Sequence, residues 1–216
     1  GVEVMIGVSS DKASSPLSLY GATKLCADKL LQAAQQEPGN KTVFAAVRLG
    51  NLLGARGSVL PHFLHLMQQG QPLQLTDPEM TRFLINVEDS SRLLLLAAQH
   101  AEGGELLIPK MPTFRLGDLI DALEPTVPVH IAGLRPGERR HEELICPEQA
   151  LAGMDCGAYY LLLPSYRRAE REALAKRLNA ALLPEGFHYG SNDPGNQLSQ
   201  AELKVAIQAY RNTATA

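Results

Sequence analysis

The sequence has few of the features that place a protein in a membrane, on nucleic acid or around a metal ion. No apolar run reaches the ~20 residues that a membrane-spanning helix requires. The net charge is −3 and the isoelectric point is near 6.1, so no basic surface for nucleic acid or acidic lipid is indicated. The three cysteines, Cys26, Cys146 and Cys156, lack the spacing of a metal site. Their odd number and irregular spacing suit a reducing cytoplasm, where we expect the protein to act without a metal ion.

The sequence also lacks the glycine-rich turn that binds dinucleotides. No G-x-G-x-x-G or G-x-x-G-x-x-G follows a predicted strand, and that turn is what places a pyrophosphate against a helix N-terminus. The 216 residues are enough for one domain, or one and a half. A glycine-rich dinucleotide-binding half-domain is therefore not expected among these residues.

A tyrosine and a lysine four residues apart are the most informative feature that is present. We predict a helix over residues 19–36, which places Tyr20 and Lys24 on one face, a single turn apart. A nearby ammonium lowers the pKa of a phenol from its usual value of ~10. Such a pair can take the proton from a substrate alcohol while hydride leaves the same carbon. Taken alone, the Y-x-x-x-K spacing is more often a solvated helix face.

The segment before this helix strengthens the catalytic interpretation. Residues 2–8 predict a short buried strand that ends at Ser9-Ser10. Open α/β sheets keep their reactive groups at the carboxyl ends of parallel strands. Ser10 could donate a hydrogen bond to the same alcohol, and Asp11 and Lys12 add a second acid/base pair.

Hydrophobic periodicity predicts further elements. A strand is expected over residues 42–49, a helix over 87–100 and a short amphipathic helix over 113–123. In the helix over 19–36, five side chains are expected to form the buried stripe, namely Ala22, Leu25, Cys26, Leu30 and Ala33.

The motif Ser9-Ser10-Asp11-Lys12, followed by Tyr20-Gly21-Ala22-Thr23-Lys24, closely resembles the extended short-chain dehydrogenase/reductases. Among these it is most similar to the nucleotide-sugar 4,6-dehydratases, in particular the C5-inverting UDP-N-acetylglucosamine type that opens pseudaminic acid biosynthesis. The second residue of the motif is usually threonine in that family, and serine keeps its hydroxyl. The resemblance implies an α/β fold with a partial NAD(P)-binding Rossmann fold, a parallel sheet with flanking helices, and a smaller α/β substrate-binding lobe. It further implies NADP as cofactor, UDP-N-acetylglucosamine as substrate and a homo-oligomeric intact enzyme.

Residue by residue, the resemblance implies two sets of functional side chains. The catalytic set is Asp11, Lys12, Tyr20 and Lys24, and the cofactor-binding set is Ser10, Tyr20 and Lys24. The substrate-binding residues come from three segments that match the family, and they are Asn51, Arg56, Ser58, Val59, Thr76, Arg82, Arg135 and Glu138. The resemblance implies that Arg82 helps to hold the diphosphate, that Arg135 contacts a phosphate and that Glu138 contacts a ribose hydroxyl. Without the resemblance, these segments are equally well explained as a flexible loop, a surface ion pair and an ordinary turn.

The same resemblance gives a domain organisation. Residues 1–58 and 83–111 are expected to form the carboxyl-terminal half of a Rossmann domain, and residues 59–82 and 112–216 the nucleotide-sugar-binding lobe. The amino-terminal glycine-rich cofactor half of the family is absent from this sequence. We therefore expect the sequence to be a carboxyl-terminal portion of a longer enzyme, inactive by itself.

The implied reaction is an internal redox dehydration of a UDP-linked N-acetylhexosamine. Tyr20 would remove the C4 hydroxyl proton, Lys12 the C5 hydrogen, and Asp11 would protonate the departing C6 hydroxyl. Three alternatives remain open. One is a C5-retaining 4,6-dehydratase. A nucleotide-sugar 4-epimerase needs Tyr20 and Lys24 but no acid/base pair beside Ser10. A non-catalytic fragment would only bind sugar nucleotides.

Overall fold

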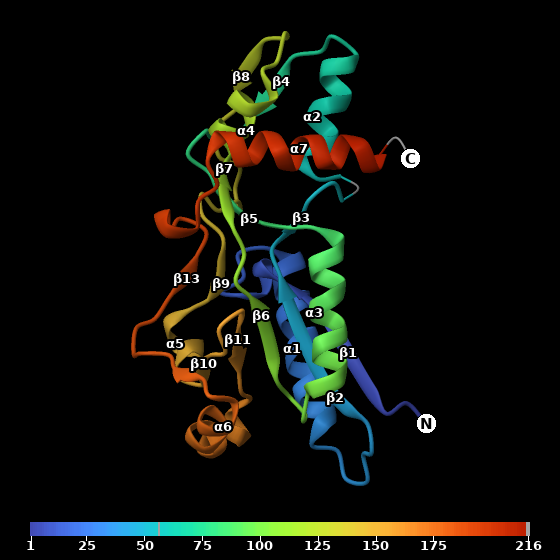
Figure 1. The fold of residues 1–216 in the computed structure, drawn as a ribbon, viewed down its shortest axis with the longest axis vertical. Coiled ribbons are helices and arrows are strands. Elements are labelled where there is room, and N and C mark those ends of the chain that lie inside the picture. Colours follow the sequence, from blue (N-terminus) through green and yellow to red (C-terminus); the bar gives the residue numbers. More distant parts are fainter. Residues whose placement is uncertain (56, 215–216) are drawn as a thin grey trace. The chain divides into compact units, whose positions relative to one another are not determined.

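The computed structural model describes residues 1–55 and 57–214, which fall into two compact units. The first unit comprises residues 1–49, 88–110 and 143–190, and the second residues 50–87, 111–142 and 191–216. Figure 1 shows the elements of both, coloured along the chain. Among the described residues, none of the helices combines the length and apolar character needed to cross a membrane.

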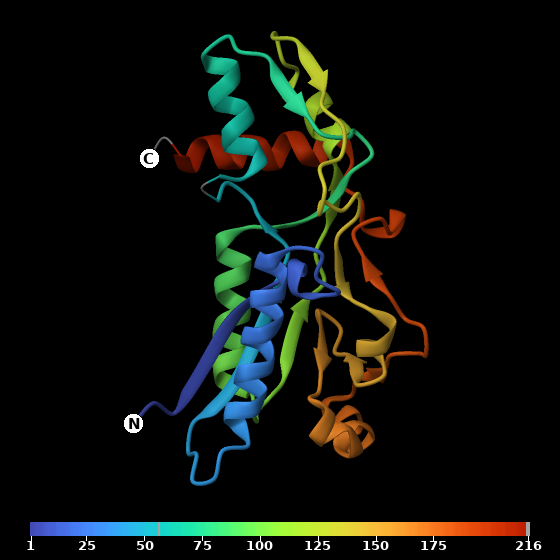
Figure 2. The same cartoon turned by 180° about the vertical axis from the view of Figure 1, so that it is seen from behind.

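The first unit is built on a six-stranded sheet with the order β1-β2-β6-β11-β10-β12. The parallel strands are β1 (Val4–Ser10), β2 (Val43–Leu49) and β6 (Leu106–Pro109). The antiparallel strands are β11 (Tyr159–Leu162), β10 (Gly153–Asp155) and β12 (Ala181–Leu182). Helices α1 (Leu19–Gln35) and α3 (Val87–His100) lie on opposite faces of the parallel strands (Figures 1 and 2). This arrangement confirms the predicted α/β fold with part of a Rossmann-type sheet.

The limits of the units differ from the expected domain organisation. Residues 143–190 belong to the first unit, whereas the sequence analysis placed 112–216 in the substrate-binding lobe. The physical reason is that β11 pairs with β6, so the sheet continues through later strands instead of ending at β6. A two-stranded sheet of β9 (Glu143–Ile145) and β13 (Tyr189–Gly190), helices α5 (Pro147–Ala150) and α6 (Arg171–Leu178) and a 3-10 segment, η2 (Ser165–Glu170), complete this unit.

Helix α1 begins and ends as predicted, but its buried face is not the expected one. The Ser18 hydroxyl accepts a hydrogen bond from the Gly21 N–H and so caps the first turn. Gly21 and Asp28 are the buried residues of the helix, while Cys26 and Leu30 are exposed. The predicted stripe is therefore wrong, and Ala33, its last member, is also exposed.

A buried ion pair explains why the helix turns this face inward. The Asp28 carboxylate accepts a hydrogen bond from the Ser9 hydroxyl of β1 at 2.9 Å. It also pairs with the Arg48 guanidinium of β2 at 3.0 Å, and the arginine side chain is only 1% exposed. A buried charge is stable only when it is paired and hydrogen-bonded, so this contact fixes the rotation of α1 against the sheet.

Over its described residues, the second unit contains two small sheets and three α-helices. Strand β5 (Thr81–Ile85) pairs in parallel with β3 (Asn51–Leu52) and antiparallel with β7 (Thr113–Arg115), and β4 (Leu73–Leu75) pairs in parallel with β8 (Val129–Ile131). The helices are α2 (Val59–Gln68), α4 (Leu116–Leu123) and α7 (Gln200–Ala214). Their apolar faces share one core, which includes Leu60, Phe63, Met80, Phe114, Leu119, Leu203 and Ile207.

The short helix predicted over 113–123 is correct only from Leu116 onward. Residues 113–115 form β7, because Thr113, Phe114 and Arg115 pair with the residues of β5 that lie about thirty positions earlier. Pairing at that separation leaves no mark in the local periodicity of the sequence.

Candidate functional site

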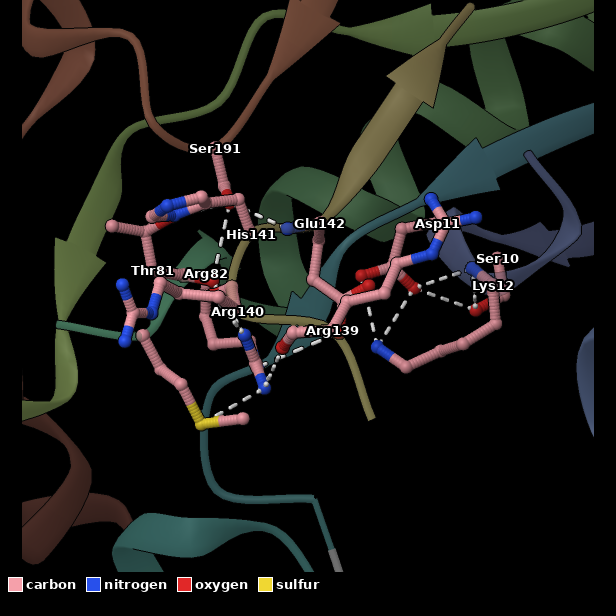
Figure 3. Close-up of polar contacts among 11 residues, drawn as sticks. Ser10, Asp11, Lys12, Thr81, Arg82, Arg139, Arg140, His141, Glu142 and Ser191 are labelled. Atoms are coloured by element: carbon pink, nitrogen blue, oxygen red, sulfur yellow. Dashed lines mark hydrogen bonds and ion pairs between the residues drawn. The ribbon is translucent and has the colours of Figure 1, made fainter. Parts of the chain in front are cut away.

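The turn after β1 carries an ion pair between neighbouring residues. Strand β1 ends at Ser10, and a single 3-10 turn, η1 (Asp11–Ala13), follows. Asp11 is 2% exposed, and its Oδ1 accepts hydrogen bonds from the Ser10 hydroxyl at 2.8 Å and the Lys12 backbone N–H at 2.9 Å. The Lys12 ammonium lies 3.0 Å from Oδ2 of the same carboxylate (Figure 3). The Ser10 hydroxyl thus donates its hydrogen bond to Asp11, and Asp11 and Lys12 form an ion pair in direct contact.

Tyr20 and Lys24 occupy one face of the first turns of α1, as predicted. The Tyr20 side chain is exposed, and the Lys24 ammonium lies 5.9 Å from the centre of its ring. The same ammonium donates a hydrogen bond to the carbonyl of Val8 at 3.1 Å, which ties it to β1. Lys24 is thus held by the strand on the side of α1 that carries the Tyr20 ring.

A glycine brings these two pairs of residues onto adjacent segments. A Cβ atom placed on Gly21 would lie 2.3 Å from the Lys12 carbonyl oxygen and 3.0 Å from Cβ of Pro16. Only glycine lets the backbone of α1 approach η1 this closely. The four side chains predicted to be catalytic, Asp11, Lys12, Tyr20 and Lys24, therefore come from two segments of the first unit that are in direct contact.

The loop that joins η1 to α1 has an anchor that the sequence analysis missed. One oxygen of Glu143, on β9, accepts hydrogen bonds from the hydroxyls of Ser14 at 2.9 Å and Ser15 at 2.8 Å. The other oxygen lies 3.0 Å from Nε2 of His188. These contacts hold Ser15 at a positive φ of 44°, an unusual backbone conformation for a residue other than glycine. No local pattern could reveal a partner 129 positions away.

The second unit contains a cavity of about 270 Å³. Its walls are mostly apolar and include Leu60, Phe114, Leu119, Leu203 and Ile207. The predicted substrate-binding residues that line it are Asn51, Ser58, Val59, Thr76, Arg82 and Glu138. Arg135 is not among the lining residues, and Arg56 lies outside the described residues. Helix α7 supplies part of the wall, a contribution that the sequence analysis did not foresee.

Two polar atoms of this wall have no hydrogen-bond partner among the described residues. They are Oδ1 of Asn51 and Oγ of Ser58. Buried polar atoms are nearly always paired in folded proteins, so unpaired ones at a cavity are candidates for pairing with a ligand. An apolar cavity with a few polar groups is also the usual form of a small-molecule site.

A cluster of polar side chains lies around β5 (Figure 3). The Thr81 hydroxyl contacts Nδ1 of His141 at 2.8 Å and the Ser191 hydroxyl at 2.7 Å. Burial lowers the pKa of His141, and the neighbouring Arg140 guanidinium lowers it further. Arg140 itself pairs with Asp77 at 2.7 Å. The hydrogen bond from the Glu79 backbone N–H is the main cause that lowers the pKa of Asp77.

The turn predicted to meet the nucleotide is closed by its own glutamate. The Glu138 carboxylate accepts a hydrogen bond from the Arg135 backbone N–H at 3.1 Å, and the Glu138 N–H donates back to the Arg135 carbonyl at 3.0 Å. Gly137 takes a positive φ of 82° within this turn. Among the described residues, no group of three or more His, Cys, Asp or Glu side chains is placed to hold a metal ion.

Comparisons with known proteins identify a family and several relatives of this chain. A family described as polysaccharide biosynthesis protein matches residues 1–164. The chain is 39% identical over 211 residues to a UDP-N-acetylglucosamine 4,6-dehydratase (inverting) of Campylobacter jejuni, with 94% of the chain aligned. The chain spans 63% of the length of that relative. It is also 35% identical over 164 residues to a UDP-glucose 4-epimerase of Rickettsia canadensis, covering 74% of the chain and 48% of the relative.

One solved structure is similar over almost the whole chain. The X-ray structure of Pen from Bacillus thuringiensis matches with a TM-score of 0.84 and 30% identity, covering 97% of this chain and 63% of that one. Both units therefore occur together in an experimentally determined protein of related sequence.

Proposed function

Because the chain belongs to the polysaccharide biosynthesis protein family, which matches residues 1–164, we propose that this protein is a UDP-N-acetylglucosamine 4,6-dehydratase of the C5-inverting kind. The observation that carries the proposal is the Asp11–Lys12 ion pair, in direct contact with the helix that presents Tyr20 and Lys24. A relative 39% identical to the chain bears this activity in its name. The proposal includes NADP as cofactor, a cytoplasmic location, a homo-oligomer and the first step of pseudaminic acid biosynthesis.

The exposed face of α1 fits a nicotinamide cofactor. Tyr20 is 55% exposed, and Lys24 is anchored on one side only, by the Val8 carbonyl. We assign Ser10, Tyr20 and Lys24 to the cofactor site. When bound, the cofactor would take a hydride from C4 of the sugar and later return it to C6. In this proposal Tyr20 accepts the proton of the C4 hydroxyl, and Lys24 lies beside its ring.

The ion pair is suited to the elimination step. The 4-ketone makes the C5 hydrogen acidic, and removal of that hydrogen needs a neutral amine at Lys12. Departure of the C6 hydroxyl needs a protonated carboxyl at Asp11. Moving one proton across the 3.0 Å from the ammonium to the carboxylate provides both forms at once. In the elimination Lys12 takes up the C5 proton, and Asp11 gives its proton to the C6 hydroxyl, which leaves as water. The ion pair is thereby restored.

The remaining step completes the reaction. The hydride held by a bound cofactor would pass to C6, and a proton delivered to C5 from the opposite face would invert that centre. The proton that Tyr20 holds balances the one delivered to C5, so the cycle has no net change in protons or oxidation state. We assign UDP to the cavity of the second unit, where Asn51, Ser58, Val59, Thr76 and Glu138 line the wall. Arg135 and Arg56 stay in the proposal as further substrate-binding residues.

The test is the Asp11→Asn variant of the full-length protein, supplied with UDP-N-acetylglucosamine and NADP and followed by NMR of the product. We expect the 4-keto-6-deoxy sugar from the unchanged protein and a rate about 10²–10⁴-fold lower from the variant, the usual value of a general acid. Asp155→Asn is the matched control, because Asp155 pairs with Lys110 at 2.8 Å in the same unit and is not assigned to the reaction. A near-normal rate in Asp11→Asn would overturn the acid assignment.

A second candidate is supported by the 35% identity to a UDP-glucose 4-epimerase. An epimerase needs only Tyr20 and Lys24, so its reaction would not use the Asp11–Lys12 ion pair. The same NMR experiment separates the candidates, because an epimerase changes C4 and keeps the C6 hydroxyl. Retention at C5 would identify the retaining dehydratase, and UDP binding with no turnover would identify a binding protein.

A further inference from the structure

Glu143 connects the loop after η1 to the sheet structure of the first unit. Its own backbone lies in β9, where it pairs with Gly190 of β13. The carbonyl of the next residue, Leu144, accepts a hydrogen bond from the buried Arg48 guanidinium at 2.8 Å, which ties β9 to β2 of the main sheet. The Glu143 side chain is therefore attached to a backbone that two other strands hold in place.

The Glu143 carboxylate binds the loop on one side and a histidine on the other. One oxygen accepts hydrogen bonds from the hydroxyls of Ser14 at 2.9 Å and Ser15 at 2.8 Å, and the other oxygen lies 3.0 Å from Nε2 of His188. Ser14 is fully buried, and the glutamate side chain is 16% exposed, so water competes little for these contacts. Hydrogen bonds to an ionised carboxylate are roughly twice as strong as those between neutral groups.

These hydrogen bonds oppose the intrinsic preference of the loop backbone. Ser15 has a φ of 44°, which is disfavoured for a residue with a Cβ atom. The Ser14 backbone N–H donates to the Asp11 carbonyl at 3.1 Å and so ends the 3-10 turn η1. Without the two hydroxyl contacts, the backbone at Ser15 would relax towards a negative φ, and the turn that carries Asp11 would lose the restraint at its end.

The same loop connects the two pairs of residues that are proposed to be catalytic. Asp11 and Lys12 precede it in η1, and Tyr20 follows it in the first turn of α1. We propose that Glu143 is a positioning residue of the reaction. Through the two serine hydroxyls it holds η1 in register with α1, and it exchanges no proton with the substrate. This inference rests on the proposed dehydratase function.

The test compares kcat and KM of the full-length protein with those of Glu143→Ala and Glu143→Gln, each supplied with UDP-N-acetylglucosamine and NADP. We expect kcat of Glu143→Ala to fall about 10²-fold, the effect of a displacement of about 1 Å between reacting groups. KM should stay unchanged, since the residues assigned to UDP belong to the second unit. Glutamine keeps an oxygen that can accept both hydroxyl hydrogen bonds, so Glu143→Gln should stay within about tenfold of the normal kcat.

A direct part of Glu143 in the chemistry would give a different pattern. Glu143→Gln would then lose as much kcat as Glu143→Ala, and this result would overturn the inference, as would a normal kcat in Glu143→Ala. Glu172→Ala is the matched control, because Glu172 is exposed on α6 of the same unit, and it should keep the normal kcat. If the unchanged full-length protein forms no 4-keto-6-deoxy sugar, the proposed function itself fails, and the inference fails with it.

A double-mutant cycle tests whether Glu143 acts through the two serines. Replacing Ser14 and Ser15 together with alanine should lower kcat by a factor similar to that of Glu143→Ala. The same replacement should have little further effect in a Glu143→Ala background, because the hydrogen bonds are already lost. Effects on kcat that simply multiply would contradict action through the serines.

Hydrogen–deuterium exchange of the full-length variants separates positioning from a general loss of stability and requires no turnover. Amide exchange over residues 10–21 should be faster in Glu143→Ala and close to normal in Glu143→Gln, while exchange in β2 and β6 stays unchanged. Exchange that is faster throughout the first unit would show a general loss of stability and would overturn the inference.

Discussion

Replacing Gly21 with alanine tests whether the contact between α1 and η1 sets the geometry of the four residues proposed to be catalytic. The added Cβ would lie 2.3 Å from the Lys12 carbonyl oxygen, whereas a carbon and a carbonyl oxygen in contact are about 3.3 Å apart. The helix and the turn must therefore move apart by roughly 1 Å, the difference between these distances. Pro16, whose Cβ would be 3.0 Å away on the same side, leaves little room for a sideways adjustment.

The consequences for stability and for activity should diverge. Overpacking costs about 1–3 kcal/mol, and alanine regains about 1 kcal/mol over glycine inside a helix. The free energy of unfolding should therefore fall by only about 0–2 kcal/mol. A displacement of 1 Å between reacting groups can cost on the order of 10²-fold in rate. We expect a folded protein with a large loss of kcat, because Tyr20 and Lys24 move with α1 while Asp11 and Lys12 stay with η1.

The assay compares kcat of the full-length variant with its urea unfolding curve followed by circular dichroism. Ala27→Gly is the matched control on the same helix, because Ala27 is exposed and its replacement should cost about 1 kcal/mol by helix propensity alone. The control should lose stability and keep its kcat. A Gly21→Ala variant with normal kcat would refute the reasoning, since the two segments would then tolerate separation without harm to the reaction.

Two other predictions concern stability. Asp28→Leu and Arg48→Met should each lower the free energy of unfolding by about 3–5 kcal/mol, because each leaves a buried charge unpaired. Urea unfolding of the double variant should show a loss of stability far smaller than the sum of the two single losses. Simple additivity of the two losses would contradict a buried ion pair. His141 has a pKa lowered mainly by burial from its usual 6.5, so as the pH falls through 6.5 the unfolded state takes up the proton first. The stability that neutral His141 contributes is therefore fully present above pH 6.5 and is lost as the pH falls towards the pKa of the folded state. His141→Asn should flatten the pH dependence of the melting temperature in this range. An unchanged pH dependence would refute the lowered pKa of His141.

Local sequence patterns were enough to predict the strand and the helix that hold the proposed catalytic residues. The helix predicted over 19–36 is α1 (Leu19–Gln35), and the strand predicted over 42–49 is β2 (Val43–Leu49). Periodicity and capping depend on residues that are close in the sequence, so they can be recognised before the fold is known. The strand predicted over 2–8 is β1 (Val4–Ser10), shifted by two residues, with Met5 and Val8 about half exposed.

The matched segments of the second unit were predicted as a set by their resemblance to a family, not by their local physics. Asn51, Ser58, Thr76 and Glu138 line one cavity although they are spread over nearly ninety positions. Their roles toward a nucleotide sugar stay a prediction. For Arg82 the resemblance implies a phosphate contact, and only the tertiary structure shows that its guanidinium also donates to the carbonyls of Arg139 and Arg140, up to 58 positions away.

The sequence by itself determined the order of the elements, the Tyr20–Lys24 spacing and the Asp11–Lys12 neighbourhood, because each depends on residues within a few positions of one another. The tertiary structure decided which face of α1 is buried, through Asp28 and Arg48, and which acceptors take the donors of Arg82. Buried ion pairs and long-range hydrogen bonds form between residues that come into contact only when the chain is folded. The sequence lists these residues, but it does not show which of them come into contact.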